Sequence, residues 1–498
     1  MLIWWMKDHR NKSPGIIKCT RKRTRMRTAI IDIGSNAVRS VVYSDNSIGA
    51  YEVYHERFKV DLASLFTETD INIKHPFYAI VSRFLDIFHK LDVVEIKCVA
   101  TAVLRQSPKA EEFCTLLHNK YKINVEIISG EQEAFLSSYG LFMGSPNPHG
   151  MIADLGGGSL EIAQVQSRKI TNLKSLPLGT QVLSKIEDVS LEYLVGQIRS
   201  VYENPEKSRL HLIGGGFRVI AREYIRHTNY PLYNLHNLEI NVADLSQYLQ
   251  HLQNNQKEIF NLNRKHDRFA IIVLQGLIEV FTPDTVLISN YGLKEGVRFT
   301  SLPQEERYKD IIFERCKAFV GYKDNSIDLD GYTRVIQNIL NTQENYLYEI
   351  NDIIKLSLML INFKKNIDKN FVAHFLSHTI LMSEIPFTHK QRASIALILF
   401  NAFGIKPGKH VEHIAQIVLD KYEYKMACII SKLINILLII DGPELSSKCS
   451  LEIALDQEDK LVIKTFQTLP YTLFNHITRQ LKSITKIQDP LNDEIKSS

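Results

Sequence analysis

Cysteine is scarce in this sequence, and the six cysteines that occur lie far apart. No two of them form a Cys-x-x-Cys pair, so neither a disulfide framework nor a cysteine-rich zinc site is predicted. A chain of this kind suits a reducing compartment, and we predict a cytoplasmic protein. The cysteines are Cys19, Cys98, Cys114, Cys316, Cys428 and Cys449.

Long apolar runs, glycine and proline are also in short supply. Runs such as residues 433–440 fall well short of the ~18 apolar residues that a membrane span needs. The 23 glycines and 15 prolines are far too few for a collagen-like or low-complexity chain. Membrane-spanning, fibrous and disordered classes are therefore excluded, and an ordinary globular protein is expected.

An overall excess of one charge is missing once the first residues are set aside. Residues 1–27 hold nine Lys or Arg against one acid, and the remaining 471 residues carry a net charge of −3. The body therefore gives no argument for sequence-specific nucleic-acid binding. The basic extension 1–27 stays open to three interpretations: a disordered tail, an over-long start before Met26, or contact with an anionic membrane surface or polymer.

The length predicts several cores. At 498 residues the chain is roughly three times a typical ~150-residue domain. Up to about residue 300 apolar strands alternate with helices, which indicates α/β layers. Residues 306–448 follow helical spacing, and a short β-like stretch at 451–466 and a last helix come after them.

One pattern occurs twice, 122 residues apart. Residues 28–43 read as an apolar strand that ends in Asp32, a Gly-Ser-Asn turn and a second strand. Residues 150–165 repeat this with Asp154 and a Gly-Gly-Gly-Ser turn. Such a separation predicts two similar domains, each presenting a turn to a cleft between them.

The turns are suited to phosphate. A glycine turn after a strand can direct several backbone N–H groups into one concavity, which binds an anion without a basic side chain. A third such turn starts at Gly214. Carboxylates beside these turns are the ligands that Mg²⁺ prefers. The sequence thus predicts phosphate binding by Gly34, Ser35, Asn36, Gly156, Gly157, Gly158, Ser159, Gly215 and Gly216, and metal binding by Asp32, Asp154 and Glu161.

Six ordered motifs between residues 28 and 300 resemble the exopolyphosphatase and guanosine pentaphosphate phosphatase family, within the sugar kinase and actin superfold. They are Asp32-Ile-Gly-Ser-Asn36 with Arg39, Ala100-Thr101 through Arg105, Ile128-Ser-Gly-Glu-Gln-Glu-Ala134, Asp154-Leu-Gly-Gly-Gly-Ser-Leu-Glu161, Leu176-Pro-Leu-Gly-Thr180 and Gly214-Gly-Gly-Phe-Arg218.

The resemblance implies a fold and a division into domains. The fold class would be α/β, with two actin-like, ribonuclease H-like domains flanking a cleft and a mostly helical C-terminal domain similar to HD-type phosphohydrolases. The boundaries would be a basic extension at 1–27, domain I at 28–138, domain II at 139–303 and the helical domain at 304–498. The His-Asp pair of HD domains is missing, because Leu358-Met-Leu-Ile-Asn-Phe363 stands there.

The resemblance also implies residue roles. Glu133 matches the carboxylate that activates the attacking water, and Arg105 matches a phosphate-contacting arginine. Asp154 and Glu161 would act with a bound Mg²⁺. Helical histidine pairs such as His374 and His378 are expected to pack rather than to bind metal.

The implied activity is hydrolysis of the terminal phosphoanhydride of inorganic polyphosphate, with release of orthophosphate. A guanosine pentaphosphate phosphatase or a bifunctional enzyme needs the same residues and stays open. From other classes, a kinase or actin-like ATPase and a non-catalytic sensor of polyphosphate or alarmone remain as alternatives. A homodimer is also implied.

Overall fold

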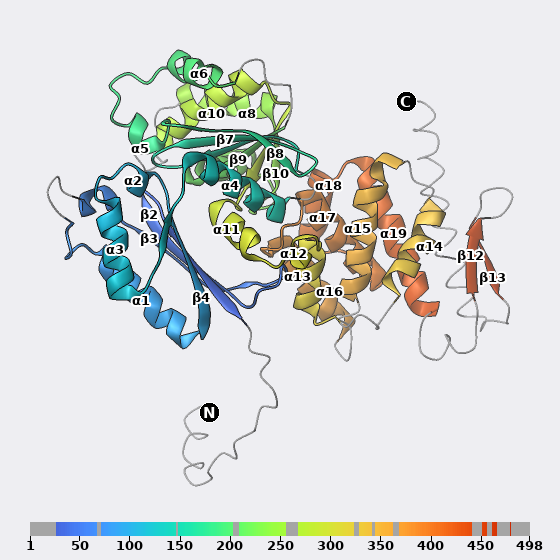
Figure 1. The fold of residues 1–498 in the computed structure, drawn as a ribbon. Helices are drawn as coiled ribbons and strands as arrows, with labels where there is room; N and C mark the ends of the chain where they lie inside the picture. The colour runs from blue at the N-terminus through green and yellow to red at the C-terminus, as the bar shows by residue number, and fades with distance from the viewer. Residues whose placement is uncertain are drawn as a thin grey trace, which may run out of the picture.

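A computed structural model describes residues 26–440 together with residues 451–455, 461–465 and 479 (Figure 1). The short internal segments 67–70, 146–147, 203–208, 255–266, 323–327, 341–343 and 362–367 are outside the described part. The predicted basic extension up to residue 25 and the predicted last helix also lie outside the described residues.

The first sheet is built from five strands in the order β3-β2-β1-β4-β5. β1 and β2 form the predicted hairpin, β3 extends it on the same side, and β4 and β5 are parallel to β1. β1 and β2 are buried on both faces, which is why both read as continuous apolar runs. The elements are β1 (Arg27–Ile33), β2 (Ala37–Tyr43), β3 (Glu52–Lys59), β4 (Val93–Ala100), β5 (Val125–Ile127), the 3₁₀ turn η1 (Leu62–Leu65), α1 (Phe77–Lys90), α2 (Ala102–Arg105) and α3 (Ala110–Tyr121).

The second sheet repeats this plan, in the order β10-β11-β9-β6-β7-β8. β6, β7 and β8 are antiparallel neighbours, and β9 and β11 are parallel to β6. The predicted duplication is confirmed, since Asp32 and Asp154 each stand one residue before the end of the central strand. The elements are β6 (Gly150–Leu155), β7 (Leu160–Gln166), β8 (Lys169–Leu176), β9 (Leu210–Gly214), β10 (Leu238–Asn241), β11 (Thr285–Ser289), α5 (Thr180–Leu183), α6 (Leu191–Arg199), α7 (Gly215–Thr228), α8 (Val242–Asn254) and α10 (Asp267–Phe281).

Two helices lie between the sheets: α4 (Gly130–Gly144) and α11 (Leu293–Ser301) (Figure 1). α4 packs on β7 and β8 of the second sheet, whereas Val297 of α11 packs on Ile30 and Val41 of the first. The helices touch backbone to backbone, because a Cβ on Gly296 would lie 1.8 Å from the Leu136 carbonyl oxygen. This glycine crossing fixes how the two domains meet.

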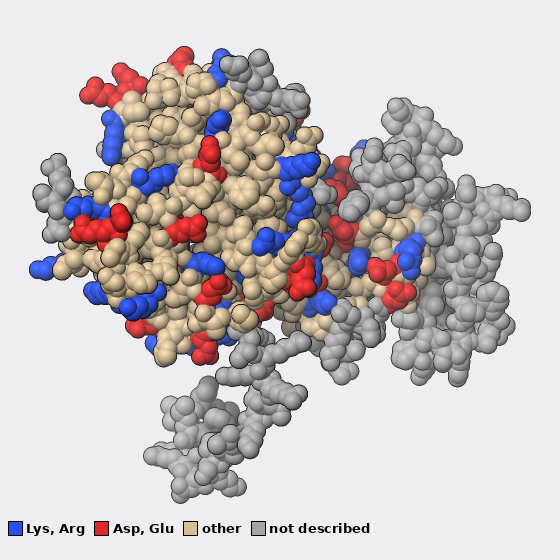
Figure 2. All heavy atoms as spheres, viewed as in Figure 1, with Lys and Arg blue, Asp and Glu red and all other residues tan. Residues whose placement is uncertain are grey.

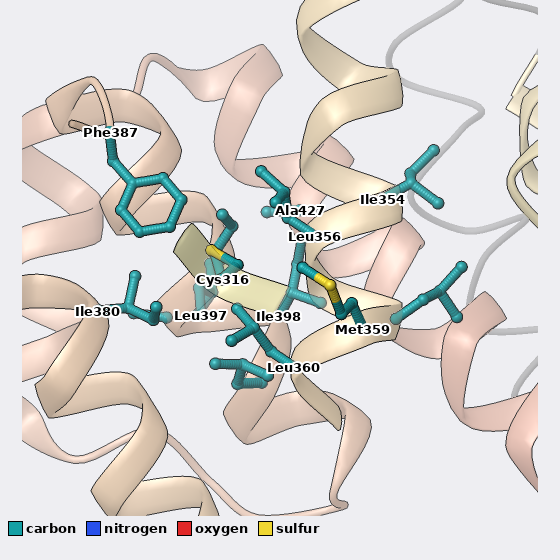
Figure 3. Close-up of a cluster of buried hydrophobic side chains, with 14 of the residues drawn as sticks. Cys316, Ile354, Leu356, Met359, Leu360, Ile380, Phe387, Leu397, Ile398 and Ala427 are labelled. Carbon is teal, nitrogen blue, oxygen red and sulfur yellow. The ribbon is translucent and has the colours of Figure 1, made fainter. Parts of the chain in front are cut away.

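The rest of the described chain is helical, as predicted. Its helices are α12 (Gln304–Arg307), α13 (Ile311–Val320), α14 (Leu329–Leu340), α15 (Glu344–Ile361), α16 (Lys369–Met382), α17 (His389–Ala402), α18 (Lys409–Val418) and α19 (Lys421–Ile440), and the strands β12 (Leu451–Leu455) and β13 (Leu461–Thr465) pair beyond them. α17 is buried on nearly every side, which identifies it as the centre of the bundle. Figure 3 shows Leu397 and Ile398 of α17 beside Leu356 and Met359 of α15.

The helical bundle shares one apolar core with the α/β part. Met143, Leu232 and Tyr291 from the second domain belong to the same buried cluster as the bundle residues. The side-chain amide of Asn237 donates to the carbonyl oxygens of Gly144 and of Pro386, both at 3.0 Å. Within the described residues, no helix is long and apolar enough to cross a membrane. On the face in Figure 2, basic and acidic side chains are interspersed.

Candidate active site between the two sheets

The turns after β1 and β6 have the same local geometry. The N–H of Gly34 donates to the Ala37 carbonyl at 3.1 Å, and the N–H of Gly156 donates to the Ser159 carbonyl at 3.0 Å. Each turn follows an aspartate at the carboxyl end of its strand, and Asp32 is buried whereas Asp154 is partly buried. The predicted equivalence of the two turns thus extends from sequence to hydrogen bonding.

The second turn directs its N–H groups away from α5. The carbonyl oxygens of Gly156 and Gly157 accept hydrogen bonds from the N–H groups of Thr180 and Gln181, at 3.1 and 2.8 Å. In a planar trans peptide the N–H points opposite to the carbonyl. The N–H groups of Gly157 and Gly158 therefore point to the other side, as a phosphate cradle requires.

The two turns lie against each other. The Gln181 side-chain amide donates to Asn36 Oδ1, which joins the second domain to the first. A Cβ on Gly157 would lie 2.6 Å from Asn36 Nδ2, and a Cβ on Gly158 would lie 2.5 Å from the Ala102 Cβ. Glycine is needed here because the opposite domain approaches so closely.

The third predicted turn begins α7. Gly214 has φ +118°, a conformation that favours glycine, and it precedes the helix without a side-chain cap. A Cβ on Gly216 would lie 2.6 Å from the Ala270 Cβ, so this glycine also lets α7 pack closely on α10. Gly215 has open space around it. Phosphate binding by Gly215 and Gly216 stays a prediction.

Asp154 and Glu161 are brought together by strand pairing. They are directly opposite one another in the β6–β7 register, so their side chains share one face. Ser137 Oγ donates to Asp154 Oδ2 at 2.6 Å, and Ser175 Oγ donates to Glu161 Oε1 at 2.9 Å. These serines orient the two carboxylates, and no sequence pattern singled out either serine.

Glu133 reaches the same space from α4. The helix begins with a capping box in which Ser129 and Gln132 hold each other's backbone N–H groups, and this places Glu133 in the first turn. Arg105 Nη1 donates to Glu133 Oε2 at 3.2 Å and to the Ile128 carbonyl at 2.8 Å. The resemblance assigned these two residues to one site, and the structure brings them into contact.

Burial raises the pKa of all three acids, and neighbouring acids add to the effect. Burial, followed by the charges of Glu161 and Asp154, raises the pKa of Glu133 well above its ordinary value, although Arg105 opposes the effect. Burial and then Asp154 raise the pKa of Glu161 to about 7. Burial also raises the pKa of Asp154, against the opposing effects of Ser137 and Arg218. A cluster of this kind is short of positive charge.

That shortage fits a divalent cation. Within the part of the chain that the structure describes, no three side chains of His, Cys, Asp or Glu are arranged to hold an ion by themselves. Mg²⁺ usually takes only one or two carboxylates and completes its shell with water and phosphate oxygens. Asp154 and Glu161 fit that pattern. Asp32 is 5% exposed and forms an ion pair with Arg39 at 3.0 Å, so a metal would compete with this arginine for it.

Basic side chains from both domains lie near the acids, Arg39 on β2 and Arg218 on α7. Arg39 and Arg218 each interact favourably with Asp154. Burial, followed by Arg39, lowers the pKa of Arg218 to about 10, and Arg57 contributes to the same shift. Sequence reasoning missed Arg57. The signal was its place on a strand in which His55, Arg57 and Lys59 alternate with other residues.

Two further features are a lysine at the domain boundary and the histidines of the helical bundle. Lys294 is half-buried and lies 2.6 Å from Glu52 Oε1 and 3.0 Å from Glu295 Oε1, so it links the first domain to α11. In the helical bundle, the rings of His374 and His378 stack at 6.2 Å and those of His378 and His410 at 6.0 Å. These histidines form no metal-holding group among the described residues.

Chemically, the site joins three elements. It has two turns suited to phosphate oxygens, a pair of carboxylates suited to a hard cation, and a third carboxylate oriented by an arginine. Phosphoryl transfer depends mainly on such positioning and on charge neutralisation.

Comparison with known proteins gives consistent results. The model of the Ppx/GppA phosphatase family matches residues 41–305. Retrograde regulation protein 2 of Saccharomyces cerevisiae is 22% identical over 462 residues, 79% of this chain and 76% of that protein. The bifunctional 3-dehydroquinate synthase/phosphatase of Fusobacterium nucleatum is 24% identical over 298 residues, 52% of this chain and 44% of that protein.

Solved structures match about half of the chain. The Aquifex aeolicus Ppx/GppA enzyme is 22% identical and has a TM-score of 0.47, covering 55% of this chain and 98% of its own. An exopolyphosphatase from Cytophaga hutchinsonii is 18% identical with a TM-score of 0.48, covering 55% of this chain and 97% of its own.

Proposed function

Because the chain belongs to the Ppx/GppA phosphatase family, we propose that it is a hydrolase that releases orthophosphate from the end of inorganic polyphosphate with the help of Mg²⁺. The observation that carries the proposal is the contact between Arg105 and Glu133 at 3.2 Å, beside the paired carboxylates Asp154 and Glu161. An ordinary structural ion pair does not need two further buried acids next to it.

Each group has a role in this proposal. Glu133 accepts a proton from the attacking water, which requires its ionised form. Arg105 keeps that carboxylate oriented and lies where its planar guanidinium can reach a phosphate oxygen. The N–H groups of Gly157 and Gly158 bind oxygens of the same phosphate.

The metal belongs to the paired carboxylates. Asp154 and Glu161 would hold Mg²⁺, with Asp32 near enough to Asp154 to influence its pKa. When bound, the ion neutralises charge on the phosphate oxygens. A cation there also favours the ionised forms of the acids, which Glu133 needs in order to accept a proton.

The preference for polyphosphate over guanosine pentaphosphate is a finer part of the proposal. Arg39 and Arg218 add positive charge to the cleft, beyond what one transferred phosphate requires. We also propose that the protein acts in the cytoplasm as a homodimer. A relationship of the helical bundle to HD-type domains stays a prediction.

The test is phosphate release by the purified protein with long-chain polyphosphate, guanosine pentaphosphate and ATP side by side. We expect release from polyphosphate that stops when EDTA removes the metal. A clear preference for guanosine pentaphosphate would move the assignment to the nucleotide phosphatase. Release from ATP alone would contradict both assignments.

A second candidate is a sensor that binds polyphosphate or an alarmone without turnover. The similarity to retrograde regulation protein 2 of Saccharomyces cerevisiae favours a sensor. That similarity spans 79% of this chain and so extends beyond residues 41–305, which the family model matches. The direct contact between Asn36 and Gln181 also suits a closed, binding state. Tight polyphosphate binding without phosphate release from any of the three substrates would support the sensor.

A further inference from the structure

Strand β3 carries a row of nitrogen-bearing side chains that the proposed chemistry does not use. His55, Arg57 and Lys59 alternate along the strand and are all exposed. In the strand register, Arg57 lies opposite Arg39 and Arg39 lies opposite Asp32. Residues paired in this way project from the same face of a sheet, so the row lies on the face that carries the catalytic cleft.

The row begins at the first phosphate turn. Lys59 pairs with Ala37, the residue directly after Gly34-Ser35-Asn36, and the N–H of Val60 donates to the Asn36 carbonyl at 3.4 Å. Arg57 is the next residue on this face and lies close enough to Arg218 to influence its charge. The cations are thus continuous with the site and lead away from it along β3.

The acids of the strand are arranged differently. Glu56 points to the opposite face, where Tyr54 donates to it and Arg83 pairs with it at 2.9 Å. Glu52 lies at the far end and pairs with Lys294 at 2.6 Å. His55 is 3.6 Å from Glu52, at the same far end. The near part of the exposed face is therefore basic.

We propose that β3 is the binding track for the phosphates behind the terminal one, with Lys59 and Arg57 as its cationic contacts and His55 as a hydrogen-bond donor further along. The direction of the track rests on the proposed function, because that function places the reacting end at the acids. β3 is the edge strand of its sheet, so a chain can lie along it from solvent. Successive side chains on one face of a strand are about 7 Å apart, so a linear polyanion meets them in turn.

The track predicts a chain-length effect. Tripolyphosphate is short enough to be held by the turns and acids alone, whereas a long chain extends over β3. Charge–phosphate contacts also make binding dependent on salt, and each lost contact lowers the slope of log affinity against log salt by about 0.7 for a single-stranded polyanion.

The experiment compares the double variant R57Q/K59Q with R83Q/K174Q. The control removes the same charge from exposed positions away from the track, since Arg83 lies on the opposite side of β3 and Lys174 is on β8. Binding of long-chain polyphosphate and of tripolyphosphate is measured in EDTA, where turnover is not needed, at several salt concentrations. The Michaelis constants for both are then measured with Mg²⁺. The variant R57K and a thermal unfolding curve of each variant show whether weaker binding comes from the lost charge or from impaired folding.

We expect R57Q/K59Q to bind long-chain polyphosphate about tenfold more weakly or worse, with a salt slope lower by about 1.4, and to lose much less affinity for tripolyphosphate. R57K should restore much of the loss. The track would be overturned if the two double variants had equal effects on binding or if neither had an effect. It would also be overturned if the wild type did not bind long-chain polyphosphate, or bound single-stranded RNA with equal affinity. If the binding difference is found but no substrate releases phosphate, the track stands and the proposed hydrolysis fails.

Discussion

Glu133, Asp154 and Glu161 lie close together in the site, and the charges of Asp154 and Glu161 add to burial in disfavouring the ionisation of Glu133. Glu133 is the one that an arginine holds at its side. Substitution by glutamine keeps its size and its hydrogen bonding but removes its ability to accept a proton. This single substitution is therefore the most direct test of the proposed chemistry.

Glu133→Gln is expected to lower kcat for phosphate release by about 10²- to 10⁴-fold, the usual contribution of a general base, while KM changes little. Glu131→Gln is the matched control, because Glu131 lies in the first turn of the same helix and is exposed. Steady-state kinetics on polyphosphate measure both. Unchanged turnover in Glu133→Gln would remove the general-base role.

Glu161 predicts a pH dependence. Its pKa is raised from 4.5 to about 7 by burial and by Asp154, so the folded state binds its proton more tightly than the unfolded state. Stability should therefore fall as pH rises from about 4.5 to about 7, by roughly 3 kcal/mol for this group. Mg²⁺ favours the ionised form, so it should stabilise the protein more at pH 8 than at pH 6. Urea unfolding with and without Mg²⁺ measures this.

The Glu161→Gln variant separates this group from the others. It should flatten the fall in stability with pH and lose most of the stabilisation by Mg²⁺, whereas Glu131→Gln should keep both. A Mg²⁺ effect of equal size at both pH values would show that the ion binds elsewhere.

At the scale of elements, the crossing of α4 and α11 sets the relation of the two sheets. Gly296→Ala would put a Cβ 1.8 Å from the Leu136 carbonyl oxygen, a backbone atom that cannot turn aside. We expect a loss of about 3 kcal/mol or more in the free energy of unfolding and reduced phosphate release, because the domains would separate at the crossing.

Gly196→Ala is the control for the crossing. Gly196 lies in α6 with no atom within 4 Å of the added methyl group. Alanine favours helix over glycine there, so a gain of up to about 1 kcal/mol is expected. Denaturant unfolding compares the two variants, and equal stability of both would show that the crossing can relax.

Much of the α/β part could be predicted because its signals are local. A strand, a turn and a second strand lie within 16 residues around Asp32 and again around Asp154, and both hairpins form as the pattern indicates. Glu133 needed the resemblance, because a helix-starting acid has an ordinary explanation in the helix dipole.

Other features depend on contacts between distant segments. Arg57 joins the site only through the register of β3 on β2, which alternation by itself does not fix. The approach of Gly157 to Asn36 and of Gly216 to Ala270 needs the packed structure, since glycines for phosphate and glycines for packing look alike in sequence. The serines that orient Asp154 and Glu161 could not be predicted from the sequence, because they too reach these acids only in the packed structure.

At the scale of the whole molecule, the helical bundle is not a separate body beside the α/β part. His236 lies between them, with its Nε2 2.7 Å from the Gly144 carbonyl and its Nδ1 accepting from the Asn290 N–H at 3.1 Å. Both ring nitrogens are thus occupied, and burial lowers its pKa to about 3, so it stays neutral. Composition and helical spacing predicted a further domain but could not indicate this shared core.

Asn237 allows a test of how the helical bundle is held to the α/β part. Its buried amide donates to carbonyl oxygens of Gly144 on one side and Pro386 on the other, and its backbone has φ +58°, which asparagine and glycine tolerate. Asn237→Gly keeps the backbone conformation and removes only the amide, so buried carbonyl oxygens lose their partner. The expected cost is about 2 kcal/mol in the free energy of unfolding, with faster proteolysis between the parts.

Asn229→Gly is the matched control, because Asn229 has φ +52° at the exposed end of α7. It should be close to neutral. Tripolyphosphate hydrolysis should survive in both variants, since neither residue lies at the acids. If Asn237→Gly is as stable as Asn229→Gly, the shared apolar core alone joins the bundle to the α/β part. If it also loses tripolyphosphate hydrolysis, the contacts of Asn237 with Gly144 and with the bundle contribute to the geometry of the site.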